Sequence, residues 1–257
     1  MRYEFPRNTP RSVRATLKET LANVHSILGE VLAGVYLYGS LAMECFQPAS
    51  SDIDLILIVK EKPTKEMSDK ILEYLKRSSK DRHIELSLVT LDAVQNPRYP
   101  MLVDLHYEWW GNTFENEEDS EILSNLYTTR QRGFRVWGAP VSDVFSKIPA
   151  DYHLRSVTED LEHTRKHLHE SADRVGYDAA VYWVLGSCRV LAFIKEGKVL
   201  SKPEGGRWGL VNLPEKYHTL IEQALSCYRG KMKERTWNHN ELEAFADYMT
   251  NAMLKKP

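Results

Sequence analysis

The chain has 257 residues, of which 42% are hydrophobic and 27% charged, a composition typical of a globular protein with one large domain or two modest ones. Its formal net charge of −2 provides no overall field that would attract nucleic acid or an anionic membrane. No apolar run approaches the length of a membrane span, and three cysteines without a CxxC pair indicate reduced thiols, so we expect a cytoplasmic protein without nucleic-acid or membrane partners.

The first half of the chain mixes helix and strand patterns. Thr9 can cap the first expected helix, and Pro10 suits its first turn. The apolar spacing predicts helices at 9–30 and from 64 onward, and strands at 35–40, 54–60, 83–91 and 102–110. This order favours an α+β domain with a small mixed β-sheet flanked by helices rather than a regular series of parallel units.

The second half of the chain is predicted to be helical. Helical patterns cover residues 120–138, 151–172, 177–197, 213–230 and 240–256. The segment 177–197 is the most apolar and is the natural central helix of a bundle. A shift in composition near Pro149 predicts two domains, a mixed domain over 1–149 and an all-α helical domain over 150–257.

Two carboxylates stand at the start of the strand at 54–60. Asp52 and Asp54 are two residues apart, so their side chains leave the same face of an extended chain and can reach a shared cation. Mg²⁺ is the natural candidate, because it prefers oxygen ligands and is often held by two carboxylates together with phosphates. Gly39 and Ser40 end the preceding strand, and a Gly-Ser turn before a helix can present backbone N–H groups to phosphate.

A third carboxylate, Glu85, lies in the strand at 83–91, on the side opposite to Ile84 and Leu86. If this strand pairs beside the strand of Asp52 and Asp54, the acids converge. The alternative is that they are unrelated surface acids at strand ends. An Asp-x-Asp pair alone is weak support, since it arises by chance in chains of this length.

The segment "LYGSLAMECFQPASSDIDLILIV" resembles the Gly-Ser … Asp-x-Asp signature of the nucleotidyltransferase superfamily. The rest of the chain resembles the streptomycin/spectinomycin adenylyltransferase branch, through "IELSLVT", "RYPMLVDLHYEWW", "CRVLAFIKEGKVLSKPEGGRW" and "LPEKYHTLIEQAL". The resemblance implies transfer of AMP from ATP to a hydroxyl of an aminoglycoside or aminocyclitol, with release of pyrophosphate.

The resemblance also implies roles for individual residues. Asp52 and Asp54 would bind Mg²⁺, two ions in all, and Glu85 would complete the metal site and act as the general base. The residues expected to hold the nucleotide are Gly39, Ser40, Ser51, Arg189 and Lys202. Arg189 could instead form a structural ion pair, and Lys202 could be a solvated loop residue.

Trp110 matches the tryptophan of the family that packs beside the drug, although it could equally be a core residue, and Asp178 lies where the family uses acidic residues against the cationic acceptor. The segment "HESADRVGYDAAVYW" around Asp178 departs from the pattern of the family. We expect a monomeric enzyme with a small cationic acceptor. Two alternatives stay open: the same reaction on a sugar, lincosamide or protein hydroxyl, and a noncatalytic binding module of the antitoxin type.

Two further patterns have ordinary explanations. His163 and His167 are four residues apart, as in some zinc sites, but a solvated helix surface explains them better because no third ligand is evident. The acidic run at 115–121 is interpreted as the solvated start of a helix, where carboxylates favour the positive end of the helix dipole.

Overall fold

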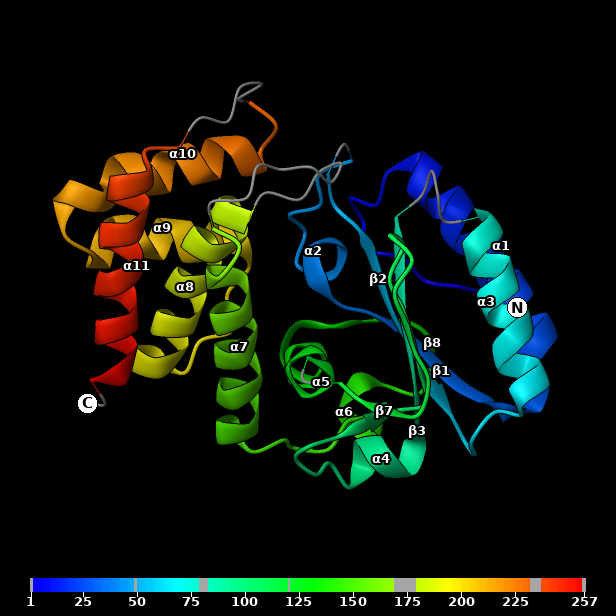
Figure 1. The fold of residues 1–257 in the computed structure, drawn as a ribbon. Coiled ribbons are helices and arrows are strands. Elements are labelled where there is room, and N and C mark those ends of the chain that lie inside the picture. Colours follow the sequence, from blue (N-terminus) through cyan, green and yellow to red (C-terminus); the bar gives the residue numbers. More distant parts are fainter. Residues whose placement is uncertain are drawn as a thin grey trace. The chain divides into compact units, whose positions relative to one another are not determined.

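The computed structural model describes residues 2–48, 50–78, 83–119, 121–168, 179–231 and 237–255 (Figure 1). The chain divides into two compact units. The first consists of Met1–Phe46 and Ser51–His153, and the second of Gln47–Ser50 and Leu154–Pro257. The predicted division after residue 149 lies at the start of helix α7 (Ala150–Arg165). It stays a prediction that each half forms a domain of its own.

The first unit is built on a six-stranded mixed sheet. Its strand order is β6-β5-β3-β2-β1-β8, in which β2 and β3 are parallel and the other neighbours are antiparallel. The strands are β1 (Leu32–Leu37), β2 (Ile53–Val59), β3 (Ile84–Thr90), β5 (Leu105–Tyr107), β6 (Thr113–Phe114) and β8 (Phe134–Gly138). A small second sheet pairs β4 (Leu102–Val103) with β7 (Glu117–Glu118). The mixed sheet confirms the predicted α+β class.

Helices cover both faces of this sheet (Figure 1). On one face lie α1 (Arg11–Leu28) and α3 (Lys65–Ser78), and on the other lies α5 (Ile122–Arg132). The short helical segments are α2 (Gly39–Ala42), α4 (Leu91–Gln95), α6 (Val141–Val144) and the 3₁₀ turn η1 (Gly29–Val31).

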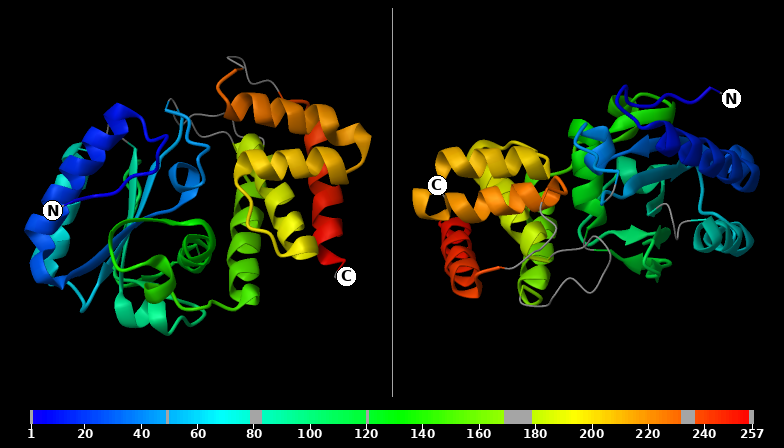
Figure 2. Two further views of the ribbon diagram at one scale, coloured as in Figure 1. Left: turned by 180° about the vertical axis from the view of Figure 1, so that it is seen from behind. Right: turned by 90° about the horizontal axis from the view of Figure 1, so that it is seen from above.

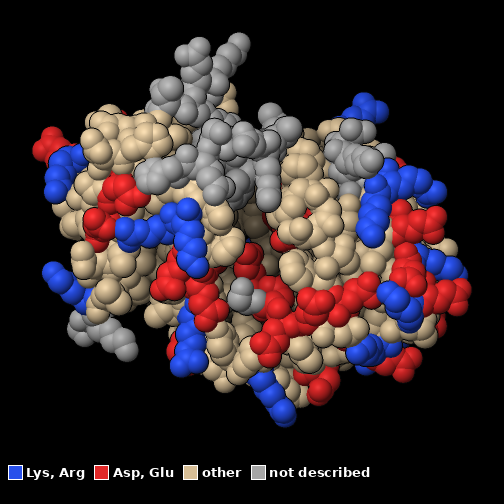
Figure 3. Space-filling model, in the orientation of Figure 1, with Lys and Arg blue, Asp and Glu red and all other residues tan. Residues whose placement is uncertain are grey.

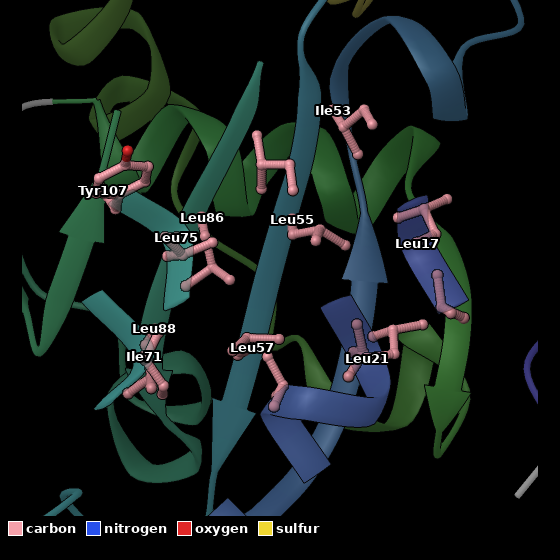
Figure 4. Close-up of a cluster of buried hydrophobic side chains, with 14 of the residues drawn as sticks. Leu17, Leu21, Ile53, Leu55, Leu57, Ile71, Leu75, Leu86, Leu88 and Tyr107 are labelled. Carbon is pink, nitrogen blue, oxygen red and sulfur yellow. The ribbon is translucent and has the colours of Figure 1, made fainter. Parts of the chain in front are cut away.

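Strand β2 is buried on both faces because its side chains alternate between two apolar clusters. Leu55 and Leu57 belong to the cluster beneath α1 and α3, as Figure 4 shows, and Ile56 and Ile58 belong to the cluster on the side of α5. The apolar run that predicted this strand therefore reflects a central position in the sheet.

The second unit is an assembly of helices, as predicted. The most apolar helix, α8 (Ala179–Glu196), packs against α9 (Lys202–Asn212), α10 (His218–Tyr228) and α11 (His239–Leu254). The 3₁₀ turn η2 (Glu215–Tyr217) leads into α10. Helices α9 and α10 run side by side, while α7 and α11 run across their direction (Figure 2). Within the described ranges, no helix is long and apolar enough to cross a membrane.

Two predicted helix features are wrong in the first unit. The helix expected over 120–138 ends at Arg132, because Gly133 leaves helical geometry and the next residues form β8 at the edge of the sheet. Thr9 does not cap the first helix. Its hydroxyl donates a hydrogen bond to the carbonyl of Pro6 at 2.7 Å, and Pro10 takes the N-cap position.

Two other segments differ from the prediction. The strand expected over 102–110 is split into β4 and β5, and only β5 joins the main sheet. Lys202 was expected in a loop, but it is the first residue of α9, whose N-terminus has a capping box formed by Ser201 and Glu204.

The central position of β2 can be tested by shortening one of its buried side chains. We expect Leu57→Ala to lower the free energy of unfolding by about 2 to 5 kcal/mol, because Leu57 is fully buried and its loss leaves a cavity. Urea denaturation measures this change. Leu102→Ala, at a side chain that is 58% exposed in the same unit, should change stability by less than about 0.5 kcal/mol. Equal effects of the two substitutions would contradict the buried position of Leu57.

Candidate active site

The parallel pairing of β2 and β3 brings the predicted carboxylates together. Asp54 is the direct partner of Glu85 across the two strands, so both side chains leave the same face of the sheet. Asp52 lies two residues before Asp54, just ahead of β2, and its Oδ1 is 3.9 Å from Nδ1 of His83. The condition on which the prediction depended, that the two strands are neighbours, is therefore met.

The Gly39 turn lies directly against Asp54. Gly39 has a φ of +60°, and a Cβ at this position would come 1.9 Å from Oδ2 of Asp54. Any other side chain would both strain the backbone and displace the carboxylate. The backbone N–H of the preceding Tyr38 also donates a hydrogen bond to the carbonyl of Asp54 at 3.2 Å. Gly39 therefore fixes how closely the turn can approach the carboxylate.

Ser40 is the second residue of α2 and is half-buried beside this turn. Its carbonyl accepts a hydrogen bond from the N–H of Cys45 at 2.9 Å, which closes the loop that follows. Ser51 is also half-buried and immediately precedes Asp52. The predicted phosphate-binding residues of the first unit thus flank the two aspartates in sequence and lie at the ends of β1 and β2.

A tyrosine missed by the sequence analysis holds Glu85. The hydroxyl of Tyr38 donates a hydrogen bond to Oε1 of Glu85 at 2.7 Å, and Nδ2 of Asn125 on α5 donates to the same hydroxyl at 3.3 Å. Burial, followed by the negative charges of Glu85 and Asp54, raises the pKa of Tyr38 well above its ordinary value, so the phenol stays a donor. The sequence offered one indication of a role for Tyr38, namely its position directly before Gly39.

The pKa of Glu85 is raised above its ordinary value of 4.5. Burial is the largest cause, and the charges of Asp52 and Glu108 act in the same direction. The charge of His106 and the hydrogen bond from Tyr38 oppose the rise without cancelling it. Glu85 is thus a carboxylate whose ionised form is disfavoured unless positive charge comes near.

His106 on β5 is the buried cationic partner on this face. Its Nδ1 is 2.9 Å from Oγ of Ser87, and its Nε2 is 3.7 Å from Oε1 of Glu108. Burial lowers its pKa, but the interaction with Glu108 and the charges of Glu85 and Asp119 outweigh burial and raise the pKa above 6.5. Glu85, Glu108 and Asp119 thus place several negative charges around the His106 imidazole.

Two adjacent tryptophans, Trp109 and Trp110, follow shortly after β5. Trp110, the residue singled out from the sequence, is 40% exposed and meets Trp109 edge-on with ring centroids 5.5 Å apart. Trp109 is stacked on His83 with centroids 3.9 Å apart, and its indole N–H is buried without a hydrogen-bond partner among the described residues. Because His83 lies beside Asp52, Trp109 is the tryptophan that the structure links to the carboxylates.

The donor set suits a hard divalent cation. Asp54 and Glu85 offer carboxylate oxygens on one face, the charge of Asp52 acts on Glu85, and the glycine at position 39 leaves room for the carboxylate of Asp54. In the described part of the chain, no group of three or more His, Cys, Asp or Glu side chains is arranged to hold a metal ion. The chemistry of a site with two carboxylate ligands and substrate phosphates, which is common for Mg²⁺, fits these residues.

Arg189 belongs to the second unit, on α8. Its Nε is buried without a hydrogen-bond partner among the described residues, an arrangement that costs free energy unless a ligand supplies an acceptor. Its side chain passes over Gly205 on α9, where a Cβ would lie 2.6 Å from Cγ of Arg189. The ion pair considered for Arg189 does not occur within the described ranges at this Nε.

Lys202 stands one turn before Gly205 and lies near the same seam between α8 and α9. Its ammonium group is 4.5 Å from the centroid of the Tyr182 ring, so it is not simply a solvated side chain. Asp178, the predicted acceptor contact, lies outside the described residues.

The surface of the first unit has many acidic side chains on one face. A band of Asp and Glu side chains crosses the face of the first unit that Figure 3 shows. The acidic run at 115–121 was interpreted above as a helix start, but its exposed Glu117 and Glu118 form strand β7 and helix α5 begins only at Ile122. A surface of this kind attracts cations.

Comparisons with known proteins find adenylyltransferases that are similar to this chain. A family model described as "Aminoglycoside adenylyltransferase, C-terminal domain" matches residues 143–252. A spectinomycin 9-adenylyltransferase of Staphylococcus aureus (strain Mu50 / ATCC 700699) is 24% identical over 251 residues, which cover 91% of this chain and 93% of the relative. An aminoglycoside (3'') (9) adenylyltransferase of Klebsiella pneumoniae is 24% identical over 257 residues and 95% of both chains.

One solved structure shares the fold. The crystal structure of spectinomycin adenyltransferase AAD(9) from Enterococcus faecialis, with ATP and spectinomycin, superposes with a TM-score of 0.80 and 19% sequence identity. The match covers 94% of this chain and 99% of that one.

The raised pKa of Glu85 predicts a pH-dependent stability effect. Because the folded state disfavours ionised Glu85, its charge opposes folding at pH values above 4.5. Glu85→Gln removes this charge and keeps an oxygen for Tyr38, so the variant should be more stable than the wild type at pH 8 without divalent cations. The gain should shrink as the pH falls toward 4.5, where the carboxyl is protonated in the unfolded state as well.

Urea denaturation at pH 8 and pH 5 measures this difference. Glu117→Gln, at an exposed position in β7, is the matched control and should change stability by less than about 0.5 kcal/mol at both values. A destabilised Glu85→Gln variant at pH 8 would show that burial of the charge is not the dominant effect.

Proposed function

We propose that this chain is an aminoglycoside adenylyltransferase, which moves AMP from ATP to a hydroxyl of an aminoglycoside or aminocyclitol and releases pyrophosphate. The observation that carries the proposal is the pairing of Asp54 with Glu85 beside the Gly39 turn. It gives one face of the sheet both a cation-binding pair and a carboxylate able to accept a proton.

Glu85 would act as the general base. It takes the proton from the acceptor hydroxyl as the oxygen attacks the α-phosphorus of ATP, and the bond from that phosphorus to the leaving pyrophosphate breaks. Burial raises the pKa of Glu85 when no cation is bound, which favours proton acceptance by this carboxylate over an ordinary one. Tyr38 would keep the carboxylate oriented through its hydrogen bond.

Asp52 and Asp54 would bind Mg²⁺, and the proposal includes two ions with Glu85 as a further ligand. When bound, Mg²⁺ neutralises the charge on the entering and leaving oxygens of an in-line displacement. The missing side chain of Gly39 then matters, because a Cβ at this position would occupy the space of an Asp54 carboxylate oxygen. Positive charge at this face would also remove the penalty of keeping Glu85 ionised.

The triphosphate would be held from several sides. Gly39, Ser40 and Ser51 offer backbone and hydroxyl donors beside the aspartates. Arg189 and Lys202 are proposed to contact phosphate oxygens of the same nucleotide. The buried, unpartnered Nε of Arg189 supports its part in this proposal, because a phosphate oxygen is the acceptor that it lacks.

The acceptor is proposed to be a small cationic molecule. Trp109 and Trp110 offer ring surfaces, and the acidic groups near His106 attract ammonium groups. Asp178 stays a predicted contact for the same molecule. The protein is further proposed to act as a monomer in the cytoplasm, where ATP is available.

The direct test is incubation with MgATP and a panel of aminoglycosides and aminocyclitols, with detection of pyrophosphate and mass measurement of the products. We expect at least one panel member to gain the mass of one adenylyl group, which is AMP less one water. Products formed only with a sugar, a lincosamide or a protein would keep the reaction and change the acceptor. A chain that binds MgATP but modifies none of these would favour the noncatalytic binding module.

Glu85→Gln separates chemistry from nucleotide binding. The variant should lose at least about 100-fold in kcat, because Gln cannot accept the proton, while MgATP binding measured by calorimetry persists. Glu118→Gln, in the exposed strand β7, should retain the activity of the wild type. Loss of nucleotide binding in Glu85→Gln would mean that Glu85 is mainly a metal ligand and not the base.

Arg189 can be tested directly and through its neighbour. Arg189→Ala should weaken MgATP binding by about 10- to 100-fold, since a charge-assisted hydrogen bond is lost. Gly205→Ala should also weaken it, because the added Cβ displaces the Arg189 side chain. The matched control is Gly206→Ala, whose Cβ would meet Leu225 instead.

Gly206→Ala should lower thermal stability while MgATP affinity in the folded protein stays near the wild-type value. Equal losses of affinity in Gly205→Ala and Gly206→Ala would point to a general disturbance of α9 and would exclude a specific effect on Arg189.

A further inference from the structure

The hydroxyl of Tyr38 lies between two polar side chains that come from different elements of the first unit. It donates a hydrogen bond of 2.7 Å to Oε1 of Glu85 on β3 and accepts one of 3.3 Å from Nδ2 of Asn125 on α5. Glu85 and Asn125 are 47 and 87 positions away from Tyr38 along the chain, so only the fold brings the three together. A row of hydrogen bonds thus runs from α5 through the end of β1 to the proposed base.

The direction of this row follows from the number of protons available. A phenol has one proton, so its hydroxyl can donate a single hydrogen bond. Ionised Glu85 has no proton to give, and burial, followed by the charges of Glu85 and Asp54, holds the pKa of Tyr38 well above its ordinary value, so the phenol stays protonated. The Tyr38 proton therefore points to Glu85, and the second partner of the hydroxyl has to be a donor. The amide nitrogen of Asn125 meets this requirement, whereas a carboxylate at the same place would compete for the proton.

Asn125 is held by the helix that carries it. Its N–H donates a hydrogen bond to the carbonyl of Glu121 at 3.0 Å, and its carbonyl accepts one from Oγ1 of Thr129 at 2.7 Å. The next residue, Leu126, is fully buried in the apolar cluster to which the Tyr38 ring also belongs. The packing of this cluster therefore brings the amide group and the phenol together.

The direction of the phenol proton decides which oxygen of Glu85 is held. Tyr38 engages Oε1, and Oε2 receives no hydrogen bond from the residues that the structure describes. A hydroxyl that accepts a hydrogen bond is polarised into a stronger donor, so Asn125 strengthens the bond that orients the carboxylate. A carboxylate oriented before the reaction lowers the entropic cost of proton transfer, and Oε2 is the oxygen left for the acceptor hydroxyl.

We propose that Asn125 is a positioning residue for the general base: its amide group directs the Tyr38 proton to Oε1 of Glu85 and so leaves Oε2 for the acceptor hydroxyl. This inference rests on the proposed function, since it assumes that Glu85 accepts the proton. It assigns to α5 an effect on the transfer step that is exerted through Tyr38 and depends on a donor at position 125.

The test measures kcat, both KM values and MgATP affinity of Asn125 variants with the acceptor that the wild type modifies. Asn125→Leu keeps a similar volume and removes the donor, so kcat should fall about 2- to 10-fold, the range expected for one hydrogen bond. MgATP affinity measured by calorimetry and both KM values should stay within about twofold of the wild type, because the proposed effect is on the transfer step. Asn125→Ala serves in place of Asn125→Leu if the latter does not fold.

Asn125→Asp gives the sharper comparison. Asp matches the shape of Asn but replaces the donor with an acceptor that competes for the Tyr38 proton, so kcat should fall further than in Asn125→Leu. A role in packing alone predicts the opposite order, because Asp is the closer match in shape. Gln131→Glu makes the same exchange of amide for carboxylate at an exposed position of α5 and should keep kcat within about twofold of the wild type.

A double-mutant cycle with Tyr38→Phe shows whether Asn125 acts through the phenol. Tyr38→Phe removes the hydroxyl and should itself lower kcat. In this background, Asn125→Leu should cause no further loss of kcat, because the hydroxyl that Asn125 directs is no longer present.

Five results would overturn the inference: an unchanged kcat in Asn125→Leu, a higher kcat in Asn125→Asp than in Asn125→Leu, equal losses in Asn125→Asp and Gln131→Glu, an undiminished effect of Asn125→Leu in the Tyr38→Phe background, or a loss of MgATP affinity with kcat unchanged. In each case the wild type would still transfer AMP, so the proposed function would stand. A wild-type chain that transfers no AMP would overturn both.

Discussion

The parallel pairing of β2 with β3 is the constraint from which the candidate site follows. It sets Asp54 opposite Glu85, and the side-chain alternation of the strands turns both toward one face. The same alternation sends Leu55 and Leu57 into the core beneath α1 and α3. A slip of one residue in the register would turn the carboxylates into the core beneath α1 and α3 and move Leu55 and Leu57 to the opposite face, so the packing of the core also secures the geometry of the site.

This arrangement concentrates negative charge. Burial and the neighbouring acids raise the pKa of Glu85, and His106 supplies only part of the compensation. Folding therefore tolerates an electrostatic penalty at this face, which a bound cation would relieve. The second unit has the opposite feature, because Arg189 keeps a buried Nε without a partner among the described residues. In the proposed adenylyl transfer, Mg²⁺ would relieve the penalty in the first unit, and a phosphate oxygen would supply the acceptor that the Nε of Arg189 lacks.

Much of this could be predicted from the sequence, because the relevant signals are local. The apolar run of β2, the Asp52 and Asp54 pair and the mixed α+β class were all accessible, and the fold class is confirmed. Helix α9 was missed because its glycines have low helix propensity, whereas close packing of Gly206 and Gly209 against neighbouring helices explains why they occur there. Strand β8 was taken as helix because its conformation depends on pairing with β1. Trp109 and Trp110 are adjacent, and only tertiary contacts distinguish them.

The most direct measurement is the dependence of ATP binding on Mg²⁺ in the wild type and in Asp54→Asn. Asn keeps the shape of the side chain beside Gly39 and removes its charge. Calorimetric titration of ATP into the wild type should show affinity that rises strongly with Mg²⁺ concentration, and Asp54→Asn should lose most of that dependence while remaining folded. Equal Mg²⁺ dependence in the two proteins would contradict a cation site at the paired strands, and with it the proposed role of this face.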